Sequence, residues 1–80
     1  MRIEVRLFAS LERFVPGSRA GEPFVVELDD GASWASLLDA IGVDGNRIHL
    51  AYVNGRAVSD RSRGLSDGDR VGLFPPVGGG

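Results

Sequence analysis

The chain has 80 residues, of which 42% are hydrophobic and 25% are charged, with a formal net charge of −2. This composition is typical of a small globular domain, and we expect these 80 residues to form one domain with no room for a second. Because the charges are interspersed, and no apolar stretch approaches a membrane span or the core of a signal peptide, we expect a cytoplasmic protein that binds neither nucleic acid nor membrane.

The first part of the chain predicts two strands. Apolar and polar residues alternate over residues 1–7, which indicates a strand with one buried face, and Phe8 falls on the opposite side. Residues 10–15 are expected to form one or two helical turns. An exposed loop then leads to a second strand at residues 24–28.

One main helix is predicted in the middle of the chain. Ser33 is suited to cap its N-terminus, and Gly42 is suited to end it. The apolar residues between them recur at helical spacing, so they form one stripe that must pack on the sheet. The members of this stripe are Trp34, Leu37, Leu38 and Ile41.

The second half predicts a hairpin and a final strand. Asn54-Gly55 stands between residues 49–53 and residues 56–58, and this dipeptide is the strongest two-residue signal for a type I′ turn. A turn at residues 67–69 precedes the last strand at residues 70–74.

The order strand, strand, helix, hairpin, strand predicts an α+β fold of the β-grasp type, with a mixed sheet packed on one main helix. In this arrangement the first and last strands lie side by side and parallel at the centre. We expect the domain to span residues 1–76 and a flexible, glycine-rich C-terminal tail to follow at residues 77–80.

Catalytic and metal-binding patterns are weak in this sequence. His49 is the only histidine, and nothing marks it as a base or a ligand. Asp29-Asp30 and Asp67-Gly68-Asp69 stand where turns favour aspartate, and neither begins an EF-hand loop. The chain has no cysteine, which excludes disulfides and thiolate chemistry. We therefore expect no metal site and no cofactor bound by the chain itself.

Two phenylalanines suggest a docking surface. Phe8 and Phe74 each lie off the alternating apolar face of a strand that is expected to be central. If those strands are neighbours, both rings share one sheet face, where an apolar cluster can bind a partner. The alternative for Phe8 is coverage by residues 10–23. Trp34, in register with the helical stripe, is expected to pack in the core.

The C-terminal segment is the most informative part of the sequence. A proline pair fixes two φ angles and removes two backbone donors, so the chain should leave the domain there. From Val77 to Gly80 an extended chain reaches about 13 Å, and glycines pass through a narrow channel that side chains would obstruct. We therefore predict a reactive carboxylate at Gly80. The alternative is a frayed terminus or a cloning remnant.

Two segments carry a resemblance to a known family: Leu65-Ser66-Asp67-Gly68-Asp69-Arg70-Val71 and Phe74-Pro75-Pro76-Val77-Gly78-Gly79-Gly80. They resemble the end of the MoaD/ThiS-like sulfur carriers, which include the molybdopterin synthase small subunit and the thiamine-pathway carrier. Weaker matches upstream extend the likeness to the whole chain and imply a ubiquitin-like fold. The Phe-Pro-Pro-Val run is more similar to the molybdopterin branch, whereas Gly78 departs from the Ser, Thr or Ala more familiar there.

The resemblance implies a carrier without catalytic side chains of its own, which serves as the sulfur-donating small subunit of a synthase. A separate ATP-dependent activating enzyme would adenylate Gly80, and sulfur from a persulfide donor would convert it to a thiocarboxylate. Gly78 and Gly79, which have no side chains, would let the C-terminus pass into a partner's narrow active-site channel. Side chains near the tail would hold the activating enzyme or the large subunit of molybdopterin synthase. These implied partner-binding residues are Phe74, Leu65, Phe8, Pro75 and Pro76.

Three alternatives remain open at this point. Gly80 could instead form an isopeptide bond with a target lysine, as a ubiquitin-like modifier does. The chain itself contains no lysine, so it could not be joined to copies of itself in this way, although a genome rich in arginine codons explains that absence equally well. The sulfur could pass to the thiamine pathway, or the protein could be a non-covalent adaptor that uses only its sheet face.

Overall fold

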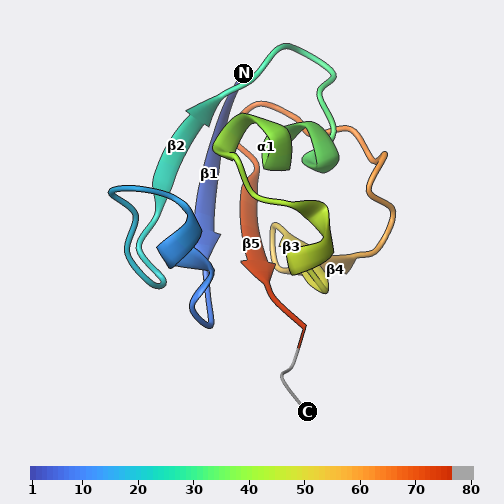
Figure 1. Ribbon diagram of the computed structural model, residues 1–80. Coiled ribbons are helices and arrows are strands. Elements are labelled where there is room, and N and C mark those ends of the chain that lie inside the picture. The colour runs from blue at the N-terminus through green and yellow to red at the C-terminus, as the bar shows by residue number, and fades with distance from the viewer. Residues whose placement is uncertain (77–80) are drawn as a thin grey trace.

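The computed structural model describes residues 1–76, which form a five-stranded mixed sheet in the order β2-β1-β5-β3-β4 with one helix across one face (Figure 1). The strands are β1 (Arg2–Leu7), β2 (Phe24–Glu27), β3 (Leu50–Val53), β4 (Arg56–Val58) and β5 (Arg70–Phe74). The helices are α1 (Trp34–Ile41) and two 3₁₀-helices, η1 (Leu11–Phe14) and η2 (Gly45–Arg47). This arrangement confirms the predicted α+β fold of the β-grasp type. No helix among the described residues has the length and apolar character needed to cross a bilayer.

The parallel pair β1 and β5 forms the centre of the sheet, as predicted. Val5 is paired with Val71 and Leu7 with Leu73, and all four side chains are buried against the core. The alternation of apolar and polar residues in both strands explains this, because one face of each strand must point toward α1. Strands β2 and β3 each pair antiparallel with this central pair.

Helix α1 begins and ends where its sequence signals predict. The Ser33 side chain accepts a hydrogen bond from the Ser36 backbone N–H, and Gly42 closes the helix at a φ of 78°. Trp34 is buried, and its indole N–H donates to the Asp60 carbonyl at 2.8 Å. The predicted packing role of Trp34 is therefore confirmed.

The hairpin between β3 and β4 turns at Asn54 and Gly55, whose φ angles of 52° and 82° are those of a type I′ turn. The side chain of Asn54 also ties the hairpin to the turn before β5, because its Nδ2 donates to Asp69 at 2.9 Å. Asp67 accepts from the Arg2 backbone N–H at 2.7 Å. Both aspartates thus act in turns, as expected.

Arg61 holds η2 beside the start of α1, which the sequence did not indicate. Its guanidinium donates to the carbonyls of Gly45 and Ile48, each at 2.8 Å, and lies 5.1 Å from the Trp34 ring. Next to it, a hydrogen bond from the Ser62 hydroxyl, with a second from the Ser62 backbone N–H, lowers the pKa of the Asp60 carboxyl. The loop after β4 therefore connects η2 to the start of α1 through the contacts of Arg61.

The structure corrects the prediction that Leu65 binds a partner. Its side chain is 5% exposed and belongs to the hydrophobic core. The isolated bridge between Ser33 and Gly64 draws this segment to the start of α1, and the Leu65 N–H donates to Ala32 at 2.8 Å. Leu65 therefore acts mainly in packing, because little of its side chain is exposed.

We predict that Leu65→Ala lowers the free energy of unfolding by about 2–5 kcal/mol, because it leaves a cavity in the core. The control is Val25→Ala, since Val25 is 52% exposed and should change stability by about 0.5 kcal/mol or less. Urea denaturation of both variants measures the difference. An unchanged midpoint for Leu65→Ala would contradict its placement in the core.

Candidate functional site

The sheet face opposite α1 carries an aromatic cluster made of Phe8, Tyr52 and Phe74. The rings of Phe8 and Phe74 are stacked, with centroids 4.6 Å apart and planes 7° from parallel. Tyr52 meets Phe74 edge-on at 5.6 Å. Both geometries are favourable for aromatic pairs. The prediction that Phe8 and Phe74 share one sheet face is confirmed, whereas Tyr52 was not anticipated.

Gly72 makes room for the aromatic cluster. This glycine lies in the middle of β5, where a side chain would project onto the same face, and a Cβ there would lie 3.2 Å from Phe8 Cε2 and 3.9 Å from Phe74 Cε2. The rings therefore cover the backbone of β5 because position 72 has no side chain. Cross-strand aromatics commonly compensate for a glycine in this way.

The alternative proposed for Phe8, coverage by residues 10–23, holds for one edge of the ring. A Cβ on Gly21 would meet Phe8 Cε1 at an ordinary contact distance of 3.7 Å, and the Gly21 N–H donates to Leu7 at 2.8 Å. Phe8 is consequently half-buried between this loop and Phe74. It supports the aromatic cluster and also contributes to its surface.

An apolar groove of about 480 Å³ extends from the aromatic cluster to the end of the described chain. It lies where β5 ends, and the His49 backbone N–H donates to the Phe74 carbonyl there at 2.8 Å. Pro75 is half-buried and Pro76 is exposed. The groove is lined by Ala9, His49, Leu50, Tyr52, Phe74, Pro75 and Pro76.

Leu50, Tyr52 and His49 reach this groove because β3 is the antiparallel neighbour of β5. Leu50 is paired with Phe74, and Tyr52 is paired with Gly72. The outward position of Tyr52 could have been found from its alternation with the buried Ala51 and Val53. Its contact with Phe74 could not, because that depends on which strands are neighbours.

Charged side chains border the aromatic cluster on the same sheet face. Arg6 donates to Glu4 at 3.3 Å, and both side chains, with Arg70, line a shallow hollow of about 290 Å³ beside Phe8 and Phe74. An apolar centre with a polar rim is the usual composition of a protein–protein interface. This face therefore has the composition of a protein–protein interface.

The chemistry of the described site is that of binding. Among residues 1–76, no group of three metal-ligating side chains lies together. The groove offers apolar surface and backbone groups, and its single imidazole, His49, has no acidic side chain beside it among the lining residues. The predicted reactive residue Gly80, with Gly78 and Gly79, lies outside the described residues. Of the predicted partner-binding set, the structure brings together Phe8, Phe74, Pro75 and Pro76.

The fold and this site define a ubiquitin-like β-grasp domain with a docking face beside its C-terminal segment. A family model described as the ThiS family matches residues 5–80, so the chain belongs to the ThiS family. The predicted resemblance to the MoaD/ThiS-like sulfur carriers is thereby confirmed. Comparison with curated proteins found no match.

Solved structures share both the fold and part of the sequence. A putative molybdopterin converting factor, subunit 1, from Pyrococcus furiosus is 30% identical with a TM-score of 0.72, over 96% of this chain and 99% of that one. Small archaeal modifier protein 1 of Haloferax volcanii is also 30% identical with a TM-score of 0.72, over 95% and 98%. A complex of subunits 1 and 2 of molybdopterin-converting factor from Helicobacter pylori contains a chain 25% identical, with a TM-score of 0.61 and full coverage of both chains.

We predict that Gly72→Ala displaces the Phe8 ring and destabilises the domain by about 1–3 kcal/mol, because the new methyl group overpacks the aromatic cluster. Nuclear Overhauser contacts between the Phe8 and Phe74 rings should weaken or vanish. Gly64→Ala is the matched control, since its Cβ would meet only the Gly31 carbonyl at 3.8 Å. Intact ring contacts in Gly72→Ala would show that the cluster does not depend on this glycine.

Proposed function

We propose that this protein is a sulfur carrier in molybdopterin biosynthesis and acts as the small subunit of a synthase. One observation carries the proposal: the aromatic cluster and the apolar groove lie at the root of the segment that continues into Val77-Gly78-Gly79-Gly80. A partner bound to this face is thus positioned to receive the C-terminus. The match to the ThiS family, which extends to residue 80, supports the same function.

The proposed chemistry takes place on the Gly80 carboxylate, which is ionised at neutral pH because an α-carboxyl has a pKa near 3.5. One oxygen attacks the α-phosphate of ATP held by a separate activating enzyme, and pyrophosphate leaves. The terminal sulfur of a persulfide donor then displaces AMP and forms an acyl disulfide. A thiol on the donor or on a separate reductant attacks the donor's sulfur in this S–S bond, which releases the thiocarboxylate on Gly80 and leaves a disulfide on the donor side. Gly78 and Gly79 give the clearance that this transfer needs. The chain supplies the carrier atom and the docking face, and its partners supply the catalytic groups.

The molybdopterin pathway is favoured by two observations. The Phe74-Pro75-Pro76-Val77 run resembles that branch more than the thiamine branch. The Pyrococcus furiosus and Helicobacter pylori structures carry the name of the molybdopterin converting factor, and the latter is a complex of its two subunits. The groove beside Phe74 is accordingly proposed to bind the large subunit in one step and the activating enzyme in another.

A second candidate function is protein modification through an isopeptide bond from Gly80 to a target lysine. It is favoured by the similarity to small archaeal modifier protein 1 of Haloferax volcanii. The fold and the glycine-rich end suit both functions, since both begin with adenylation of the terminal carboxylate. The two therefore differ only in what attacks the adenylate, a sulfur or an amine.

We predict that protein purified from its native cell contains a fraction whose mass reflects exchange of one oxygen for sulfur at Gly80. Intact-mass spectrometry before and after alkylation of the thiocarboxylate measures it. A chain lacking Gly79-Gly80 is the control and should show no exchange. Glycine-ended branches on lysines of other proteins, without any sulfur-bearing form, would favour the modifier instead.

We predict that Phe74→Ala weakens binding to the activating enzyme about 30-fold, since loss of a central aromatic anchor costs about 2 kcal/mol or more. Val25→Ala removes an exposed apolar side chain from β2 at the edge of the sheet and should leave the affinity unchanged. Calorimetric titration measures both variants, after circular dichroism has shown that each is folded. Equal affinities for the two variants would contradict the assigned docking face.

A further inference from the structure

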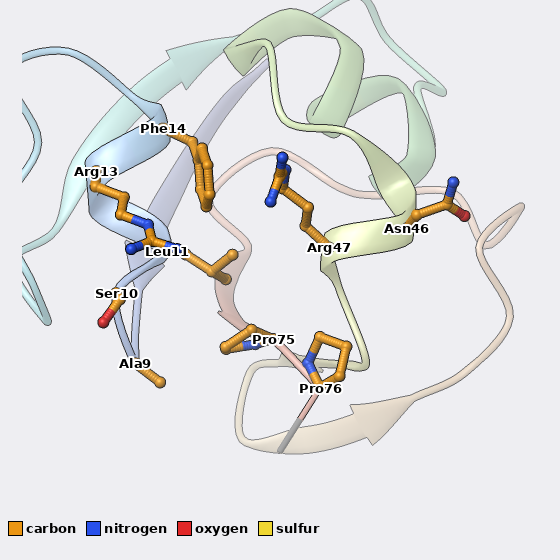
Figure 2. A pocket seen from close by; sticks show the side chains of 9 residues that line it. All are labelled: Ala9, Ser10, Leu11, Arg13, Phe14, Asn46, Arg47, Pro75 and Pro76. Carbon is orange, nitrogen blue, oxygen red and sulfur yellow. The ribbon is translucent and has the colours of Figure 1, made fainter. Parts of the chain in front are cut away.

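A second hollow flanks the same proline pair on the side away from the aromatic cluster. This arginine cleft, defined by Arg13, Phe14, Arg47, Pro75 and Pro76, has a volume of about 280 Å³ (Figure 2). Arg13 and Phe14 come from η1, and Arg47 comes from η2. The two 3₁₀-helices therefore bring basic side chains from distant parts of the sequence together beside the root of the tail.

Both guanidinium groups lie against one aromatic ring. The Cζ atoms of Arg13 and Arg47 are 5.0 Å and 4.1 Å from the centroid of Phe14, and Figure 2 shows this ring between the two side chains. Cation–π contacts of this kind are worth about 0.5–1 kcal/mol at exposed sites. They favour the positions of both guanidinium groups beside the Phe14 ring before any ligand arrives.

The arginine cleft concentrates positive charge in a protein whose net charge is −2. No aspartate or glutamate lines the cleft, and the ion pairs found within residues 1–76 involve Met1, Arg2 and Arg6 as the cations. Because both Cζ atoms lie within 5.0 Å of the same ring centroid, the guanidinium groups of Arg13 and Arg47 are no more than about 10 Å apart. This separation does not exceed the Debye length at 0.1 M salt, which is about 10 Å, so the two positive charges repel one another. An anion placed between them would relieve this repulsion.

The position of the arginine cleft indicates which kind of anion it binds. Pro75 and Pro76 line both the arginine cleft and the apolar groove, so a protein that encloses the tail must cover both. A nucleotide that reacts at Gly80 meets the chain four residues beyond Pro76, whereas the protein that encloses the tail lies against the cleft itself. Guanidinium groups form bidentate pairs with carboxylates and with phosphates, and a covering protein offers carboxylates on its aspartate and glutamate side chains.

We propose that the arginine cleft receives an acidic side chain of the protein that takes the tail. This inference rests on the proposed function for the identity of that protein, as an activating enzyme or a synthase subunit. The apolar groove then supplies affinity on one side of the proline pair. The Arg13–carboxylate and Arg47–carboxylate pairs fix the orientation on the other side, because charge complementarity selects the docking register.

The test is a nuclear magnetic resonance titration of the full chain with two capped peptides, tetraglutamate and tetraglutamine. We expect tetraglutamate alone to shift the Nε–H signals of Arg13 and Arg47. The double variant Arg13→Gln/Arg47→Gln should bind tetraglutamate about fivefold more weakly. The charge-matched control Arg56→Gln/Arg63→Gln should bind it like the wild type, because neither residue lines the cleft.

Three results would overturn the proposal. Equal affinity of the two double variants would show that tetraglutamate binds arginines without preference. Stronger binding of inorganic phosphate than of tetraglutamate at the same two signals would assign the cleft to a phosphate. Overhauser contacts between Gly79 or Gly80 and Arg47 without peptide would assign it to the chain's own terminus. This titration makes no use of sulfur chemistry, so its failure is distinguishable from the absence of a thiocarboxylate on Gly80.

Discussion

The parallel pairing of β1 with β5 is the interaction on which the rest of this structure depends. It joins residues from the two ends of the chain, with Val5 opposite Val71 and Leu7 opposite Leu73, and it buries all four under α1. The same pairing brings Phe8, which follows β1, onto Phe74 at the end of β5. Core and docking face are thus built by one pair of strands.

The two faces of strand β5 contribute to different parts of the structure. The side chains of Val71 and Leu73 lie in the core. On the opposite face, Phe74 belongs to the aromatic cluster, and Gly72 leaves room for its rings. Because side chains alternate along a strand, a substitution at Val71 or Leu73 acts on the core, whereas a substitution at Gly72 or Phe74 acts on the aromatic cluster. Phe74 is also the last residue of β5, so the proposed docking surface ends where the chain leaves the sheet.

Pro75 and Pro76 lie between two surfaces of different composition, the apolar groove and the arginine cleft. The apolar groove, with Leu50 and Tyr52, suits burial of hydrophobic side chains, and the arginine cleft suits a carboxylate. Apolar contact gives affinity without direction, whereas a pair of guanidinium groups at defined positions favours one orientation. Together they would align a partner along the path of the tail, which is what transfer chemistry at a terminal carboxylate requires.

The sequence by itself determined the elements and their order, because their signals are local. Alternation over residues 1–7, the Ser33 and Gly42 helix boundaries and the Asn54-Gly55 turn each depend on neighbours within a few residues. It also indicated Phe8 and Phe74 as outward-facing, and Pro75-Pro76 as the place where the domain ends. These features were sufficient to predict the β-grasp fold. The family resemblance came from the segments at residues 65–71 and 74–80, and the family model confirms it.

Only the tertiary structure decided which of these residues meet. Leu65 was expected at a partner and lies in the core, because the bridge from Gly64 to Ser33 is a contact between distant segments. Tyr52 joins Phe74, and Arg47 joins Arg13 and Phe14, through strand order and through the approach of η1 and η2. No period or motif encodes such proximity, since it results from how all the elements pack together around one core.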